Sequence, residues 1–87
     1  MKKVIMYGSP MCGDCVEAKK VLEAEQIRYG YVDVTAGMAH LKKFLNLRDN
    51  RPEFDAVKAE GKIGIPCFVV DDKDLYIMLP EDLNVLR

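Results

Sequence analysis

The sequence predicts an α/β fold in a single domain, residues 1–87, built on a mixed four-stranded sheet with helices on both faces. Three observations lead to this fold class. Short apolar runs alternate with segments of helical period in the first half of the chain. Two apolar runs near the C-terminal end flank a short polar turn, which is typical of an antiparallel hairpin. The length is enough for one small core and too short for two.

The first half of the chain indicates a strand-helix-strand unit. Residues 3–7 are short, β-branched and aromatic, so we expect a strand buried on both faces. A Gly-Ser-Pro turn follows, and helical period then runs from Gly13 to about Glu25. Residues 28–34 alternate in polarity and indicate a second strand. Because a helix joins the two strands, we expect them to be parallel with a right-handed crossover.

A second helix is expected next, with Asp33 and Thr35 as candidate N-caps and an end near Arg48. Its apolar stripe consists of Met38, Leu41 and Leu45, with Phe44 beside it. Pro52 suits the first turn of a further short helix, which Gly61 would end. The remaining elements are an apolar strand at 67–70, a polar turn at 71–74, a returning strand at 75–78 and a last short helix at 81–86.

Composition narrows the range of partners. The chain is 49% hydrophobic and 31% charged with a net charge of -1, which is typical of a soluble globular protein without a basic stripe. No apolar run is long enough to cross a membrane. We therefore expect a cytoplasmic monomer that binds neither nucleic acid nor membrane. In that compartment, cysteines at a regular spacing are more often catalytic or metal-binding than structural.

Two of the three cysteines form a C-x-x-C pair where the first strand gives way to the first helix. Unpaired N–H groups and the helix dipole point at the sulfur of Cys12, and both favour thiolate over thiol. Cys15 lies almost one helical turn later and faces inward, within disulfide reach. This arrangement favours Cys12 as the exposed nucleophile and Cys15 as the buried resolving thiol.

Two other interpretations of the cysteines compete with the redox dithiol. A closed zinc site needs four ligands, and the chain offers only Cys67 and His40 beyond the pair. Chance spacing is disfavoured because both cysteines fall on the one junction where the spacing matters. Cys67 itself is either a third redox thiol or metal ligand, or a small core residue, and free cysteine is among the most buried residue types.

The segment "VIMYGSPMCGDC", the "GIP" at 64–66 and the order of elements together resemble the glutaredoxin-like branch of the thioredoxin superfamily. The resemblance implies a thioredoxin-like fold over nearly the whole chain. It also implies that Cys12 attacks, that Cys15 resolves, and that Pro66 is a cis-proline facing the dithiol. The backbone of Ile65 would then pair with an extended substrate.

Further substrate contacts are expected around the dithiol. Met11 and Gly13 flank Cys12, and the family places an aspartate that holds glutathione near the position of Asp82. Ser9 stands where the family commonly has a lysine, and Met78-Leu79 where it has two glycines. These departures predict weak use of glutathione, which remains a possible co-substrate.

The sequence therefore predicts a dithiol thiol–disulfide oxidoreductase that reduces protein or mixed disulfides through Cys12 and Cys15. No metal or organic cofactor is required. The expected reductant is glutathione or a flavoprotein resembling thioredoxin reductase. Two alternatives use the same cysteines: an iron–sulfur carrier in which Cys12 of two chains and external thiols hold a [2Fe–2S] cluster, and a redox-regulated binding module.

Overall fold

Four strands form one mixed sheet in the order β2-β1-β3-β4 in the computed structural model, which describes residues 2–87. The strands are β1 (Val4–Gly8), β2 (Gly30–Asp33), β3 (Cys67–Val70) and β4 (Asp74–Ile77). β1 runs parallel to β2, and β3 runs antiparallel to both β1 and β4. The predicted pairing of the first two strands and the predicted C-terminal hairpin are both confirmed.

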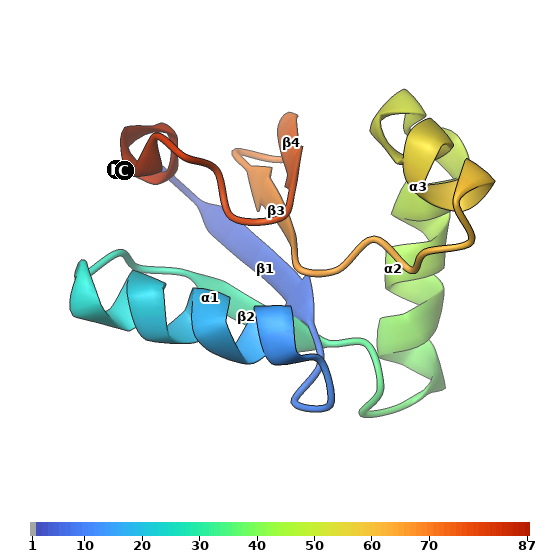
Figure 1. The fold of residues 1–87 in the computed structure, drawn as a ribbon, viewed down its shortest axis with the longest axis horizontal. Helices are drawn as coiled ribbons and strands as arrows, with labels where there is room; N and C mark the ends of the chain where they lie inside the picture. Colours follow the sequence, from blue (N-terminus) through green and yellow to red (C-terminus); the bar gives the residue numbers. More distant parts are fainter. Residues whose placement is uncertain (1) are drawn as a thin grey trace.

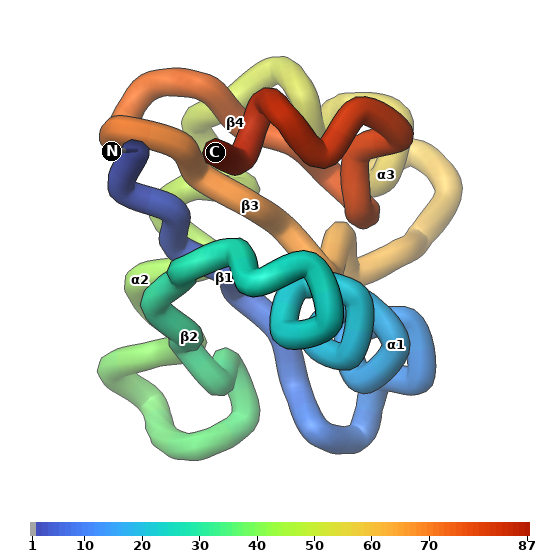
Figure 2. Tube along the Cα trace, turned by 90° about the vertical axis from the view of Figure 1, so that its left-hand side faces the viewer, coloured from blue at the N-terminus to red at the C-terminus, as the bar shows by residue number. Residues whose placement is uncertain are grey.

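Helices cover both faces of this sheet (Figure 1). The long helices are α1 (Gly13–Ala24) and α2 (Met38–Asn50), and the shorter elements are η1 (Pro52–Phe54), α3 (Asp55–Ala59) and η2 (Leu83–Leu86). α1 and η2 pack on one face, whereas α2 and η1 pack on the other. Figure 2 shows the same arrangement from the side, with α1 in front of the sheet and α2 behind it.

The core consists of two apolar clusters separated by the sheet. Met6 and Phe68 face the α1 side, where they pack with Cys15 and Leu22. The opposite face buries a second cluster of Tyr7, Val34, Phe44, Phe54, Cys67, Val69 and Leu75. Side chains alternate between the two clusters along β1 and β3, as the period of a strand requires. The expectation that the first strand is buried on both faces is confirmed.

The start of α2 differs from the prediction. The helix begins at Met38, its N-cap is Gly37, and no side chain caps it. The predicted N-caps, Asp33 and Thr35, were therefore wrong. Asp33 Oδ1 instead accepts hydrogen bonds from the backbone N–H and the hydroxyl of Thr35, at 2.8 and 2.6 Å. This local turn uses the hydrogen-bonding capacity of both side chains before the helix begins.

Two turns have the backbone geometry that their residues favour. Gly61 has φ of 71° and ends α3, because the N–H groups of Gly61 and Lys62 bond back to the carbonyls of Lys58 and Val57. In the β3-β4 hairpin, Asp71 and Asp72 both adopt positive φ, which aspartate tolerates better than most residues. The predicted stop at Gly61 is confirmed.

The C-terminal element is shorter than predicted. The sequence indicated a helix over 81–86, whereas the structure has a single 3-10 turn, Leu83–Leu86. The carboxylate of Asp82 accepts from the backbone N–H of Asn84 at 3.0 Å and so caps this turn. Leu86 is buried against the α1 cluster, which explains why the chain end stays on the sheet.

Candidate active site

Cys12 lies at the N-cap of α1, at the carboxyl end of β1. Its backbone is extended, and its Sγ accepts a hydrogen bond from the backbone N–H of Cys15 at 3.3 Å. The sulfur therefore occupies the place that a serine or aspartate oxygen takes in an ordinary helix cap. A thiolate in this position gains from the N–H group and from the positive end of the helix dipole. The side chain is partly exposed, so that a substrate can reach it.

Cys15 is fully buried in the α1 cluster. Burial above all, together with a side-chain hydrogen bond to Cys12 and the negative charges of Cys12 and Asp14, raises the pKa of its thiol to about 12, against a backbone hydrogen bond from Ser9 that lowers it. Gly8 makes room for this sulfur, because a Cβ at Gly8 would stand 3.0 Å from Cys15 Sγ. The two thiols thus differ sharply in access, since Cys12 is partly exposed and Cys15 is buried.

Cys67 is separated from the dithiol by the sheet. It is fully buried in the α2 cluster, on the face opposite Cys15, and burial raises the pKa of its thiol to about 12. Among the described residues, no group of three or more His, Cys, Asp or Glu side chains is placed to hold a metal ion. The position of Cys67 fits the interpretation as a core residue.

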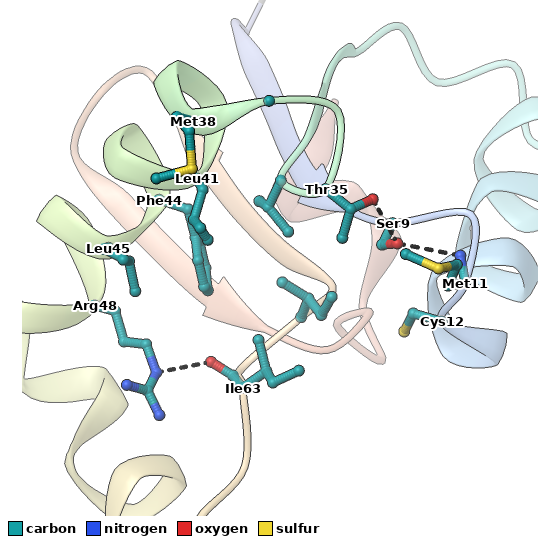
Figure 3. A pocket seen from close by; sticks show the side chains of 13 residues that line it. Ser9, Met11, Cys12, Thr35, Met38, Leu41, Phe44, Leu45, Arg48 and Ile63 are labelled. Carbon is teal, nitrogen blue, oxygen red and sulfur yellow. Dashed lines mark hydrogen bonds between the residues drawn. The ribbon is translucent and has the colours of Figure 1, made fainter.

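A cleft of about 730 Å³ opens beside Cys12 (Figure 3). Its walls come from the loop before α1, from one face of α2 and from the segment before β3. It is lined by Ser9, Met11, Cys12, Val34, Thr35, Gly37, Met38, Leu41, Phe44, Leu45, Arg48, Ile63 and Ile65. We call this cleft the apolar groove, because hydrophobic side chains dominate its lining. Met11 and Met38 are about four-fifths exposed, so they form its rim.

Three of the predicted site residues meet at this groove: Met11, Cys12 and Ile65. The peptide bond between Ile65 and Pro66 is cis, as the resemblance implied, and Pro66 is fully buried. Cys15 is buried in the α1 cluster and is not part of the groove lining as described for residues 2–87.

The other two predicted contacts lie elsewhere. Gly13 is exposed as the first residue of α1. Asp82 is exposed at the start of η2 and is not part of the groove lining as described for residues 2–87.

Sequence reasoning missed most of the groove. Met38, Leu41 and Leu45 were recognised as a helical stripe, but Phe44 is the α2 residue that is buried in the core. The stripe instead forms one wall of the cleft, and Ile63, which is 61% exposed, lies across from it. The signal in the sequence is weak: an isoleucine between a lysine and a glycine, shortly before a predicted cis-proline.

Arg48 holds the wall that carries Ile63. Its Nε donates to the carbonyl of Ile63 at 2.9 Å (Figure 3). Its Nη2 donates to the carbonyl of Lys62 at 2.7 Å. The segment 61–66 contains two glycines with positive φ and has no regular structure. The guanidinium therefore fixes a stretch that would otherwise have few constraints.

The three thiols should differ strongly in their reactivity toward alkylating agents. With a pKa of about 12, Cys15 and Cys67 are thiolate to only about one part in 10⁵ at pH 7, and both are buried. Brief iodoacetamide treatment of the folded protein, followed by mass mapping, should therefore label Cys12 alone. Unfolding in denaturant should make all three react alike. Labelling of Cys15 or Cys67 before Cys12 would contradict this description of the site.

Comparison with known proteins gives the family. The family model described as Glutaredoxin matches residues 4–75, which include the dithiol and the cis-proline. The chain belongs to the glutaredoxin family. An uncharacterized protein from Haemophilus influenzae is 32% identical over 87 residues, which cover all of this chain and 96% of that protein.

Two solved structures have the same fold as this glutaredoxin-family chain. A glutaredoxin from Methanosarcina mazei Go1 superimposes with a TM-score of 0.68 at 24% identity, over 97% of this chain and 77% of the other. A methanoredoxin from Methanosarcina acetivorans gives a TM-score of 0.71 at 19% identity, over 97% and 83% of the two chains. The thioredoxin-like fold is thereby confirmed. Within residues 2–87, no helix has the length and hydropathy needed to cross a membrane.

Proposed function

We propose that this glutaredoxin-family protein is a dithiol oxidoreductase that reduces protein disulfides. The Cys12 thiolate attacks one sulfur of the substrate disulfide, and the other substrate sulfur leaves as a thiolate and takes up a proton. Cys15 then loses its proton and attacks Cys12 Sγ, which releases the second substrate thiol. The substrate gains two electrons, and the protein is left with a Cys12–Cys15 disulfide, which an external thiol or flavoprotein reductant must reduce.

The observation that carries this proposal is the contact between the two cysteines at the helix N-terminus. Cys12 Sγ accepts from the Cys15 backbone N–H at 3.3 Å, so the reacting sulfur lies against the residue that resolves it. Cys12 is partly exposed at the N-terminus of α1, whereas Cys15 is buried and its pKa is raised to about 12. This asymmetry matches a nucleophile and a resolving thiol.

A second interaction, between the two cysteine side chains, supports a change in Cys15 during the reaction. In the free dithiol, burial, a side-chain hydrogen bond to Cys12 and the negative charge of Cys12 all raise the Cys15 pKa. Once Cys12 Sγ is bonded to a substrate sulfur, it carries no charge, and both contributions of Cys12 fall. Cys15 therefore loses its proton more easily in the mixed disulfide than before it, which favours resolution at the point where it is needed.

The apolar groove supports a protein substrate over glutathione. Arg48 is the only charged side chain in the lining among the described residues, and it already donates to two carbonyls. Ser9 stands where the family commonly has a lysine that attracts glutathione, and it is buried and hydrogen-bonded. Met78, at the position of a family glycine, keeps a positive φ of 70° with its side chain 43% exposed. A small anion finds few charged partners here.

Main-chain pairing would complete the binding of an extended substrate. In the part of the chain that the structure describes, neither the N–H nor the C=O of Ile65 has a hydrogen-bond partner. Ile65 lines the groove together with Cys12, so a substrate segment crossing Cys12 can bond to both groups. An apolar side chain next to the substrate cysteine would then enter the groove between Met38 and Ile63.

The groove can be tested by replacing its exposed apolar side chains with neutral polar ones. Met38→Gln and Ile63→Gln should each lower the preference for a protein disulfide flanked by apolar residues over a small soluble disulfide. We expect a loss of about tenfold, because each removes the burial of roughly one apolar side chain. The measurement is the ratio of kcat/KM for the two substrates with a dithiol reductant.

With a small disulfide that contains no glutathione, Met78→Gln is the matched control, because Met78 is also an exposed methionine but lies outside the groove. It should leave the ratio within about twofold of wild type, since surface substitutions away from a binding site have small effects. Equal losses in all three variants, or no loss in any, would show that the groove does not bind substrate. Efficient turnover of glutathione mixed disulfides with glutathione as reductant would contradict the proposed substrate class.

A further inference from the structure

Three side chains join the end of β2 to the loop that carries the nucleophile. Thr35 Oγ1 donates to Asp33 Oδ1 at 2.6 Å, and Thr35 Oγ1 lies 3.0 Å from Ser9 Oγ. Ser9 Oγ in turn accepts from the backbone N–H of Met11 at 3.1 Å. Figure 3 shows the last two contacts beside the groove. Ser9 is only 3% exposed, although it is polar.

The chemistry of the three side chains determines which atom donates in each of these hydrogen bonds. A threonine hydroxyl has one hydrogen, and Thr35 gives it to a carboxylate, which at neutral pH can only accept. Ser9 must therefore donate its own hydrogen to Thr35 Oγ1. Donation from each hydroxyl makes its oxygen a better acceptor for the next donor, so the sequence Met11 N–H, Ser9, Thr35, Asp33 is cooperative and ends on a negative charge.

The charge at the end of the chain is well supported. The hydrogen bonds from Thr35 lower the pKa of the Asp33 carboxyl below its usual value, and the positive charge of Lys19 adds to this effect. His40 Nδ1 also lies 3.0 Å from the Asp33 carbonyl oxygen. Asp33 is therefore ionised at neutral pH, and the hydrogen bonds from Met11 to Asp33 keep the same donors and acceptors there.

Ser9 contacts both cysteines through its backbone. Its carbonyl accepts from the N–H of Cys12 at 3.1 Å, and its own N–H bonds to the sulfur of Cys15. We propose that Asp33, Thr35 and Ser9 act as positioning residues, which hold the loop at 9–12 so that Cys12 Sγ stays within reach of Cys15. This inference rests on the proposed dithiol function and adds positioning residues for its second step.

The expected benefit is a higher effective concentration of one sulfur at the other. Resolution is an intramolecular reaction, and its rate depends on the fraction of time that the reacting atoms spend in the correct geometry. A loop held at its first residue loses less freedom when the disulfide closes. We call the hydrogen-bonded side chains of Asp33, Thr35 and Ser9 the anchor. Loss of the anchor should therefore slow resolution and make the Cys12–Cys15 disulfide less favourable relative to the dithiol.

Thr35→Val tests the anchor, because valine keeps the shape of threonine and removes the hydroxyl. We expect about a tenfold fall in the rate at which the mixed disulfide is resolved, and a similar fall in the equilibrium constant for oxidation by oxidised dithiothreitol. Thr35→Ser keeps the hydroxyl and should stay within about threefold of wild type in both. Thr35 is exposed, so both variants should fold.

A second pair of variants tests the charge. Asp33→Asn should lower both quantities in the same direction as Thr35→Val. Asp72→Asn is the matched control, because Asp72 is an exposed aspartate in the β3-β4 turn and its positive φ suits asparagine. Wild-type values for Thr35→Val and Asp33→Asn would overturn the proposal. It would also fail if Thr35→Ser lost as much as Thr35→Val, because a retained hydroxyl would then not preserve either quantity.

Amide hydrogen exchange separates this inference from the proposed function. Thr35→Val should speed exchange of the Met11 and Cys12 amides relative to that of β1, whether or not the protein catalyses disulfide exchange. If wild type does not catalyse disulfide exchange but hydrogen exchange at these amides is faster in Thr35→Val, the proposed function fails while the anchor stands. If wild type is active and the amides, the resolution rate and the equilibrium are all unchanged, the anchor fails while the function stands.

Discussion

Cys12→Ser should abolish reduction of a protein disulfide, with a fall of at least about 10³-fold in turnover, because a serine hydroxyl is not ionised at neutral pH and no other accessible thiol replaces it. Cys15 and Cys67 are fully buried, and the pKa of each thiol is about 12. The measurement is the appearance of free substrate thiols in the presence of a dithiol reductant.

Cys67→Ala is the control for loss of a thiol. Cys67 lies on the other face of the sheet from Cys15, so this variant should retain wild-type turnover after correction for any loss of folded protein. Residual activity in Cys12→Ser above the rate of the reductant alone would show that another cysteine attacks. A loss of activity in Cys67→Ala at full folding would give Cys67 a part in the reaction that its burial does not suggest.

Cys15→Ser should stop the reaction at the mixed disulfide. Cys12 can still attack, but the sulfur that would displace the substrate is absent, so a covalent adduct on Cys12 should accumulate and be visible in the intact mass. Wild type under the same conditions should show almost none. Because a buried hydroxyl in this position costs about 1–3 kcal/mol of stability, the reaction should be run well below the melting temperature.

Cys15→Ala checks that the adduct reflects the missing thiol rather than the new hydroxyl. It should accumulate the same species, since alanine also lacks a sulfur. Wild-type turnover of protein disulfides in either variant would contradict a resolving role for Cys15. Turnover restored only by added glutathione would mean that an external thiol can replace Cys15.

The sequence predicted the topology because local patterns determine it. A helix between two apolar runs requires parallel strands, and a short polar turn between two others requires an antiparallel pair. The register of β1 with β3, which pairs Tyr7 with Cys67, was not predictable, because it depends on how the two apolar clusters fill both faces of the sheet.

The contrast in exposure between Cys12 and Cys15 was predictable for the same reason, since both residues lie at one strand-to-helix junction. The anchor was not. Asp33 and Thr35 have the residue types of helix caps, and only the approach of Ser9, 26 residues away from Thr35 in sequence, shows what their oxygens bind. The groove also requires the three-dimensional fold, because its walls come from separate segments, and a stripe such as that of Met38 is read as core from the sequence alone.

Disulfide mapping of the oxidised wild-type protein tests the central claim most directly. The reduced protein is mixed with an excess of a disulfide-containing protein substrate, quenched with acid, digested without reduction and analysed by mass spectrometry. We predict one disulfide within each chain, joining Cys12 to Cys15, with Cys67 still a free thiol and the substrate reduced in equal amount. A substrate reduced without this disulfide, or a disulfide that joins Cys12 to Cys67 or to a second chain, would contradict the dithiol mechanism.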